Sequence, residues 1–178
     1  MKFKSFFFFL ALSVGLSTGL MAQKEKSQRP SPPAEATATL GEVTIDINYS
    51  SPAVKKRTIW DKLVPYGKVW RTGANEATTF EVSEDVTVNG EDLPAGKYAL
   101  FTIPGKKEWT FIFNSEADQW GAYKYDEGKD VLRVTAKPGK TPQHEERMIF
   151  EITTRGDEVA WVNLKWDKLA VGFEVKTK

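Results

Sequence analysis

Apolar and polar residues alternate along most of this chain, a pattern typical of β-strands with one buried face. The clearest run spans residues 39–49, where Val43, Ile45 and Ile47 alternate with polar neighbours. Residues 98–103 are apolar on both faces, so we expect this strand to be covered on both sides. Similar patterns predict further strands at residues 77–83, 86–88, 109–113, 131–136, 147–154, 158–165 and 169–176.

Turn residues separate these strands. Asn89-Gly90 is a strong hairpin signal, and Gly156-Asp157 predicts a second tight turn. Residues 54–63 have a mixed pattern that fits a short helical turn or an irregular connection. No long segment has a persuasive period of about 3.6 residues. The sequence therefore predicts an all-β fold: a single antiparallel β-sandwich, or a partly open barrel, of roughly nine strands.

The first part of the chain has the composition of an export signal. Lys2 and Lys4 precede an apolar run at residues 6–16, and Ala22 is a small residue before a plausible cleavage point at Gln23. Residues 23–35 contain charges and prolines without apolar periodicity, which predicts a flexible linker. We therefore expect a signal peptide at residues 1–22, a linker at 23–35 and one domain at 36–178. The mature protein would be soluble, and periplasmic or extracellular.

Charge and cysteine content exclude several classes of function. The formal net charge of the whole chain is +1, and removal of Lys2 and Lys4 with the signal leaves about −1. Without a basic excess, we expect neither nucleic acid nor an anionic membrane surface as a partner. The chain has no Cys, which excludes disulfides, thiol catalysis and thiolate metal sites.

Residues 64–78 have the highest density of specific polar and aromatic groups. Trp70, Arg71, Asn75 and Glu76 flank Gly73 within a few positions. One hypothesis is structural: Arg71 and Glu76 pair across a tight turn, with Trp70 in the core. The other is a pocket in which Trp70 offers an apolar face, while Arg71, Asn75 and Glu76 hydrogen-bond a small polar ligand. Catalysis by Glu76 is a third possibility, although no partner acid or base is evident.

A second aromatic cluster lies at residues 120–125. Trp120 and Tyr123 are candidate stacking partners for a sugar ring, although an edge strand would explain the same pattern. Trp161 and Trp166 have opposite parity in one predicted strand, so only one of them can face the core.

His144 is the only histidine, and its polar surroundings predict an exposed position rather than a metal or triad role. Residues 126–130 place oxygen ligands near a glycine but lack the spacing of a calcium loop. We therefore expect no metal site and no cofactor.

The chain resembles a secreted bacterial family known as domain of unknown function 2911. Residues 64–78 are similar to the hallmark block of that family, and further blocks match at residues 93–105, 108–110, 120–123 and 130–134. The resemblance covers most of the chain, from about Tyr49 to Val175. It implies an exported all-β domain and supplies no established activity.

Three functional hypotheses follow. The first is a binding module for a small polar or carbohydrate ligand, or for an envelope partner, with Trp70, Arg71, Asn75, Glu76, Trp120 and Tyr123 as its binding residues. The second is a hydrolase of glycan or envelope material that uses Glu76. The third is a structural role in the envelope. The fold alone does not distinguish them.

Overall fold

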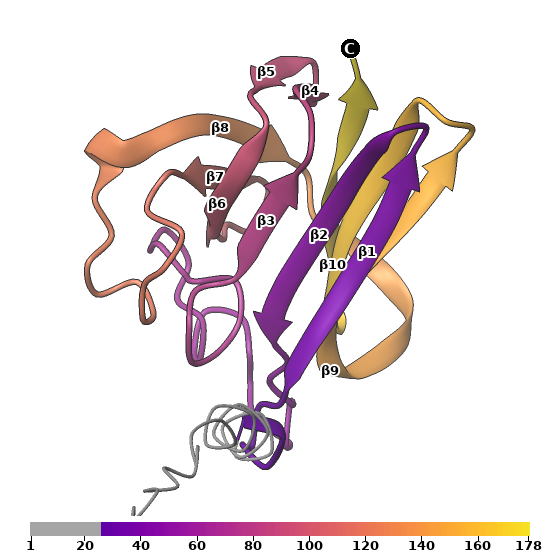
Figure 1. The fold of residues 1–178 in the computed structure, drawn as a ribbon. Helices are drawn as coiled ribbons and strands as arrows, with labels where there is room; N and C mark the ends of the chain where they lie inside the picture. Colours follow the sequence, from indigo (N-terminus) through magenta and orange to yellow (C-terminus); the bar gives the residue numbers. More distant parts are fainter. Residues whose placement is uncertain (1–25) are drawn as a thin grey trace, which may run out of the picture.

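The computed structural model describes residues 26–178, which form two antiparallel β-sheets (Figure 1). The larger sheet has the order β1-β2-β3-β6-β7-β8, and its strands are Pro33–Leu40, Val43–Ser50, Thr79–Val82, Gly96–Ile103, Trp109–Asn114 and Asp130–Ala136. The smaller sheet has the order β5-β4-β10-β9, and its strands are Glu91–Leu93, Val86–Val88, Val159–Thr177 and Gly139–Arg155. A single-turn 3₁₀ helix, η1 (Glu127–Lys129), precedes β8. The predicted all-β sandwich is confirmed, and the sheets do not close into a barrel.

The core lies between the two sheets and follows the predicted alternation. Ile45 and Ile47 of β2 are fully buried, as are Trp109, Phe111 and Phe113 of β7. Burying such side chains removes apolar surface from water at roughly 25 cal/mol per Å². The period of two therefore selects which face of each strand turns inward.

A second, smaller apolar cluster covers the outer face of the larger sheet. Ala99 and Phe101 of β6 pack there with Ala77 and Ile112, whereas Leu100 points into the main core. Ala122 and Tyr125 of the loop between β7 and η1 pack against this second cluster. The prediction that residues 98–103 are covered on both sides is therefore confirmed, and the cover is a loop rather than a helix.

The predicted turns form as expected. Asn89 and Gly90 join β4 to β5 with φ values of 50° and 88°, the left-handed conformation that such a two-residue hairpin requires. Gly156 (φ 63°) stands in the turn between β9 and β10. Residues 54–63 form turns and one isolated bridge between Trp60 and Val64, so the irregular connection occurs and the short helical turn does not.

Several strand boundaries differ from the prediction. β9 begins at Gly139 rather than at residue 147, and residues 39–49 contain the end of β1, a turn and most of β2. The strands expected at residues 158–165 and 169–176 are one strand, β10, whose register with β9 shifts around Asp167 (φ 56°). A bulge keeps the ladder continuous where the sequence breaks its alternation. Residues 33–35, expected in the linker, pair with β2 at the start of β1. The predicted signal peptide, residues 1–22, and the first residues of the linker lie outside the described part of the chain.

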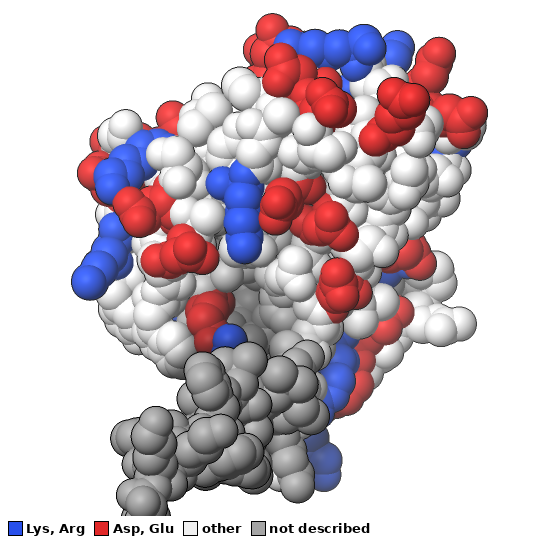
Figure 2. All heavy atoms as spheres, in the orientation of Figure 1, with Lys and Arg blue, Asp and Glu red and all other residues white. Residues whose placement is uncertain are grey.

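Acidic and basic side chains are interspersed on the face shown in Figure 2, rather than gathered into a patch of one sign. This distribution agrees with the formal net charge of +1 for the whole chain.

Candidate ligand-binding site at the 71–76 turn and the 115–126 loop

The turn at residues 71–76 is tightly constrained by its backbone. Thr72 and Asn75 have positive φ values of 55° and 58°, which residues other than glycine rarely adopt. The buried Thr78 hydroxyl donates to the Thr72 carbonyl at 2.8 Å. A Cβ atom on Gly73 would lie 3.1 Å from the Ser50 carbonyl oxygen, so a larger residue would force the turn away from β2.

Trp70 packs into the core rather than into an open pocket. Its ring stacks on Trp166 at 6.0 Å between centroids and meets Trp60 and Trp109 edge to face. Its indole N–H donates to the Gly73 carbonyl at 3.1 Å. These contacts agree with the structural interpretation of Trp70, which anchors the turn to the core.

The predicted ion pair between Arg71 and Glu76 does not form. Within residues 26–178, the Glu76 carboxylate is instead paired with Arg29, whose guanidinium lies 2.9 and 3.0 Å from its two oxygens, and with Lys26 at 3.5 Å. The sequence pattern missed this pairing because residues 26–29 lie far from Glu76 along the chain.

Arg71 lies instead against the 115–126 loop. A Cβ atom on Gly121 would lie only 2.6 Å from an Nη atom of Arg71 and 3.1 Å from the Tyr123 ring. The Arg71 Nε is buried without a hydrogen-bond partner among the described residues. Arg71 therefore packs beside the Gly121 turn, where a Cβ atom would require the end of the Arg71 side chain to shift.

Asn75 ties the turn to the beginning of the domain. Its side-chain amide donates to the Ser31 carbonyl and to the Ser50 hydroxyl, both at 3.1 Å. Since its side-chain N–H groups are used within the protein, Asn75 holds the segment before β1 in place.

The 115–126 loop is joined to the turn by backbone hydrogen bonds. Glu76 and Trp120 form an antiparallel bridge. The Ala77 N–H donates to the Gln119 carbonyl at 3.0 Å, and the Gly121 N–H donates to the Asn75 carbonyl at 3.1 Å. The two candidate clusters of the sequence therefore meet, and Trp120 lies directly beside Glu76.

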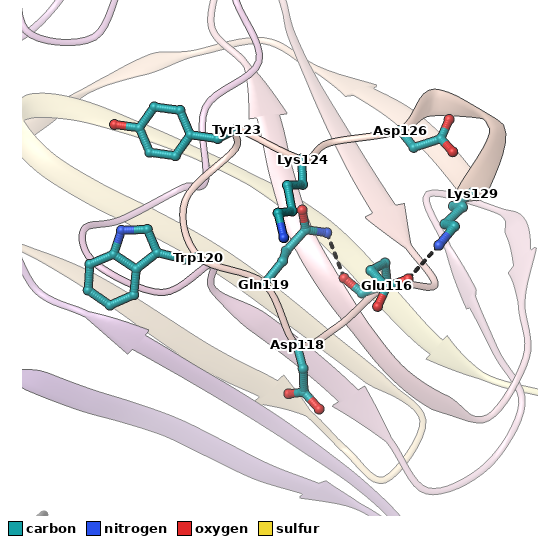
Figure 3. Close-up of a pocket in the computed structure, with 8 residues that line it drawn as sticks. All are labelled: Glu116, Asp118, Gln119, Trp120, Tyr123, Lys124, Asp126 and Lys129. Atoms are coloured by element: carbon teal, nitrogen blue, oxygen red, sulfur yellow. Dashed lines mark hydrogen bonds and ion pairs between the residues drawn. The ribbon is translucent and has the colours of Figure 1, made fainter.

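Two aromatic side chains project from this loop into solvent. Trp120 is 55 % exposed and Tyr123 is 85 % exposed, the largest such fractions among the exposed large hydrophobic residues of the described chain. Both line a pocket of about 600 Å³, in which Figure 3 draws their rings on the same side of the loop. Its other lining residues are polar or charged: Glu116, Asp118, Gln119, Lys124, Asp126 and Lys129.

A hydrogen-bond network holds this loop in shape. The buried Asn114 side chain donates to the Asp126 carbonyl at 2.9 Å and to the Asp130 carboxylate at 2.7 Å. Tyr125 donates to Asp130 at 2.6 Å, and Arg133 contacts both of them at 2.7 Å. Burial, followed by the hydrogen bond to Asp130, raises the pKa of Tyr125 to about 12. Sequence reasoning missed this network.

Glu76 is held in its ionised form. Partial burial raises its pKa, but hydrogen bonds from its own backbone N–H and from Arg29, with the charges of Arg29 and Lys26, outweigh that effect. The pKa of Glu76 therefore lies below its ordinary value. A carboxylate held ionised by two bases is poorly suited to act as a general acid.

Tyr66 lies near a different set of charged groups from those around Glu76. Burial, followed by the charge of Asp61, raises the pKa of Tyr66. The Tyr66 ring also lies 5.9 Å from the Lys106 ammonium.

His144 is exposed, as expected, and lies near Glu146 (3.3 Å) and Asp167 (3.1 Å). No group of three or more potential ligand side chains among residues 26–178 is placed to hold a metal ion. No helix in the same range is long and apolar enough to span a membrane.

The protein is an antiparallel β-sandwich in which the 115–126 loop, with its exposed aromatic residues Trp120 and Tyr123, packs on the outer face of the larger sheet. The chain belongs to the family described as protein of unknown function (DUF2911), whose model matches residues 31–175. The resemblance inferred from residues 64–78 is thereby confirmed. No curated protein and no solved structure matches the chain significantly.

Proposed function

We propose that the protein binds a small polar ligand of the carbohydrate class in the pocket lined by Trp120 and Tyr123. The observation that carries this proposal is the exposure of both rings at one pocket. A single exposed aromatic ring is common on protein surfaces, but two exposed rings that line one pocket form a patch of the kind that often marks a binding site.

The remaining lining suits the edges of a sugar ring. Stacking on an aromatic face covers the C–H groups of a sugar, while its hydroxyls require donors and acceptors in the ring plane. Asp118 and Asp126 offer acceptors, and Lys124 offers donors. The volume of about 600 Å³ falls within the usual range for small-molecule sites.

The loop also has the rigidity that binding requires. Hydrogen bonds from the Asn114 side chain to the Asp126 carbonyl and to Asp130 hold the C-terminal end of the loop, and the backbone bridge between Trp120 and Glu76 holds its centre. A site held in shape before binding loses less conformational entropy when a ligand arrives.

The test is a thermal-shift and calorimetric screen of the folded protein against neutral and acidic monosaccharides and short oligosaccharides. We expect at least one class to raise Tm, and Tyr123→Ala to weaken its binding about tenfold, in line with about 1.4 kcal/mol for a lost stacking partner. Trp161→Ala is the matched control, since Trp161 is 42 % exposed on β10 and does not line this pocket.

An unchanged affinity in Tyr123→Ala, or the absence of stabilisation by any sugar, would refute the proposal. Loss of affinity in Trp161→Ala to the same extent would also refute it, because the aromatic loop would then not be the binding surface.

We also propose that the chain is exported, with residues 1–22 as its signal. Lys2, Lys4 and the apolar run at residues 6–16 support this. Determination of the N-terminal residue of the protein recovered from the producing cell tests it: a chain that begins near Gln23 is expected, and one that retains Met1 would contradict it.

A further inference from the structure

Glu76 and Trp120 both contact a cationic side chain of the same chain, that of Arg29. The Arg29 guanidinium contacts both Glu76 oxygens and lies 5.9 Å from the centroid of the Trp120 ring. A carboxylate beside an aromatic face is the usual environment for a guanidinium, since the group gains an ion pair and a cation–π contact. The backbone bridge between Glu76 and Trp120 fixes the two side chains relative to each other.

Two hollows of about 260 Å³ adjoin this contact and share Glu76, Ala77 and Thr79 as lining residues. Lys26 and Arg29 line the first hollow. The second is lined by Glu76, Ala77, Thr79, Ala117, Asp118, Gln119 and Trp120, a set with two carboxylates and no base. Glu76 is paired with Arg29 and Lys26, so the second hollow offers an external cation the Asp118 carboxylate beside an exposed aromatic ring, and Glu76 once those bases are displaced.

An unpartnered acceptor points to the same kind of ligand. Gln119 Oε1 is buried and has no hydrogen-bond partner among the described residues, whereas its amide nitrogen donates to the Glu116 carbonyl at 2.7 Å. A buried acceptor without a donor destabilises the folded chain. This oxygen is closed to solvent, so a donor ligand reaches it only if the Gln119 side chain turns outward.

We propose that Glu76, Asp118, Gln119 and Trp120 form a binding site for a guanidinium group, such as that of an arginine-containing ligand, and that Arg29 occupies part of this site in cis. A planar guanidinium carries five N–H donors, enough to serve both carboxylates and the amide oxygen while it lies on the indole face. This site adjoins the proposed sugar pocket and shares Asp118, Gln119 and Trp120 with it, whereas Glu76 lines the second hollow and not the sugar pocket.

The contact of Arg29 with Glu76 and Trp120 competes with an external guanidinium and so lowers the affinity for it. Arg29 and Lys26 are both partly exposed, at 31 % and 51 %, and partly exposed ion pairs are weak. An external ligand can therefore displace them, and their removal should strengthen its binding.

The experiment is an NMR titration with arginine methyl ester that follows the indole N–H signal of Trp120, with citrulline methyl ester as the uncharged isostere. The double variant Lys26→Gln/Arg29→Gln should bind arginine methyl ester about three- to tenfold more tightly than the parent chain. Asp118→Asn in that background should weaken binding about threefold. Citrulline methyl ester should bind at least tenfold more weakly.

Arg29→Lys is the conservative control: it keeps a cation beside Glu76 and should leave the affinity near that of the parent. Urea denaturation of each variant verifies that it is folded. Equal binding of the two esters would overturn the proposal, and so would equal affinity of the parent chain and the double variant for arginine methyl ester. Failure of the parent chain or of the double variant to bind arginine methyl ester would also overturn it.

Tyr123 distinguishes this test from that of the sugar proposal. Tyr123 does not line the second hollow, so Tyr123→Ala should leave the affinity for arginine methyl ester unchanged. Loss of that affinity in Tyr123→Ala would place the guanidinium in the larger pocket and overturn the site proposed here.

Discussion

At the scale of single residues, glycines decide how closely the 115–126 loop approaches the 71–76 turn. Gly121 has a φ of 68°, and its missing side chain leaves room for the Arg71 guanidinium. Gly67 has a similar φ of 71° but open space around it. The two glycines therefore share one backbone requirement and differ in packing.

Gly121→Ala should destabilise the protein more than Gly67→Ala. Each substitution places an alanine at a positive φ, which costs about 1 kcal/mol. Only Gly121→Ala also brings its new Cβ atom against the Arg71 side chain. We expect an additional loss of up to about 1 kcal/mol, because the clash is with the end of a flexible side chain that can shift. Urea denaturation measures the difference, and equal losses in the two variants would show that Arg71 does not constrain this position.

At the scale of elements, the loop between β7 and β8 acts as a unit because one polar network ties both of its ends. Asn114 stands at the end of β7 and Asp130 at the start of β8, and the two are hydrogen-bonded to each other at 2.7 Å. Tyr125 adds a bond to Asp130 and packs its ring on Phe101 at 5.1 Å. The aromatic pair that projects into solvent therefore stands on a fixed base.

Tyr125→Phe should lower the free energy of unfolding by about 1–2 kcal/mol, since it removes the hydroxyl that Asp130 and Arg133 share and leaves the ring packing intact. Tyr123→Phe is the matched control two positions earlier, on a ring that is 85 % exposed, and should change stability by less than about 0.5 kcal/mol. Chemical denaturation compares them, and an equal response would show that the network does not stabilise the loop.

At the scale of the whole molecule, four tryptophans join the irregular 53–78 segment to both sheets. Trp60 and Trp70 come from that segment, Trp109 from β7 and Trp166 from β10. The centroids of neighbouring rings in this cluster lie 5.2 to 6.4 Å apart. This cluster explains why a segment with almost no regular structure is nonetheless largely ordered by the core.

Trp166→Ala should cost about 3–5 kcal/mol, whereas Trp161→Ala on the same strand should cost less than about 1 kcal/mol. Trp166 is 1 % exposed and stacks on Trp70, while Trp161 is 42 % exposed. Loss of a large buried ring leaves a cavity that the neighbouring rings cannot fill. Thermal or urea unfolding tests this, and similar losses in the two variants would contradict the core position of Trp166.

Much of the fold could be predicted from the sequence because strand burial is a local property. The period of two identified the inward faces of β2 and β7, and opposite parity separated Trp161 from Trp166. Asn89-Gly90 specified its own turn because few other residues adopt positive φ at two successive positions. The family could be identified for a similar reason, since its hallmark block is continuous in sequence.

The arrangement of the candidate site could be predicted only in part. The sequence selected Glu76 and Trp120 as candidates, but it paired Glu76 with Arg71, its neighbour in the turn. The fold instead brings Arg29 to Glu76 and places Arg71 beneath Gly121. Ion pairs form between side chains that are close in space, and a pattern read along the chain has no information about residues 47 positions apart.

The sequence by itself therefore determined which residues are buried in strands, where the turns stand and to which family the chain belongs. These properties depend on side-chain periodicity and on backbone preferences, which act between near neighbours. Only the tertiary structure decided that the 115–126 loop covers β6, that Trp120 lies beside Glu76, and that Arg29 occupies the space between them. Those contacts join distant segments, and they exist only once the two sheets have packed and brought the segments together.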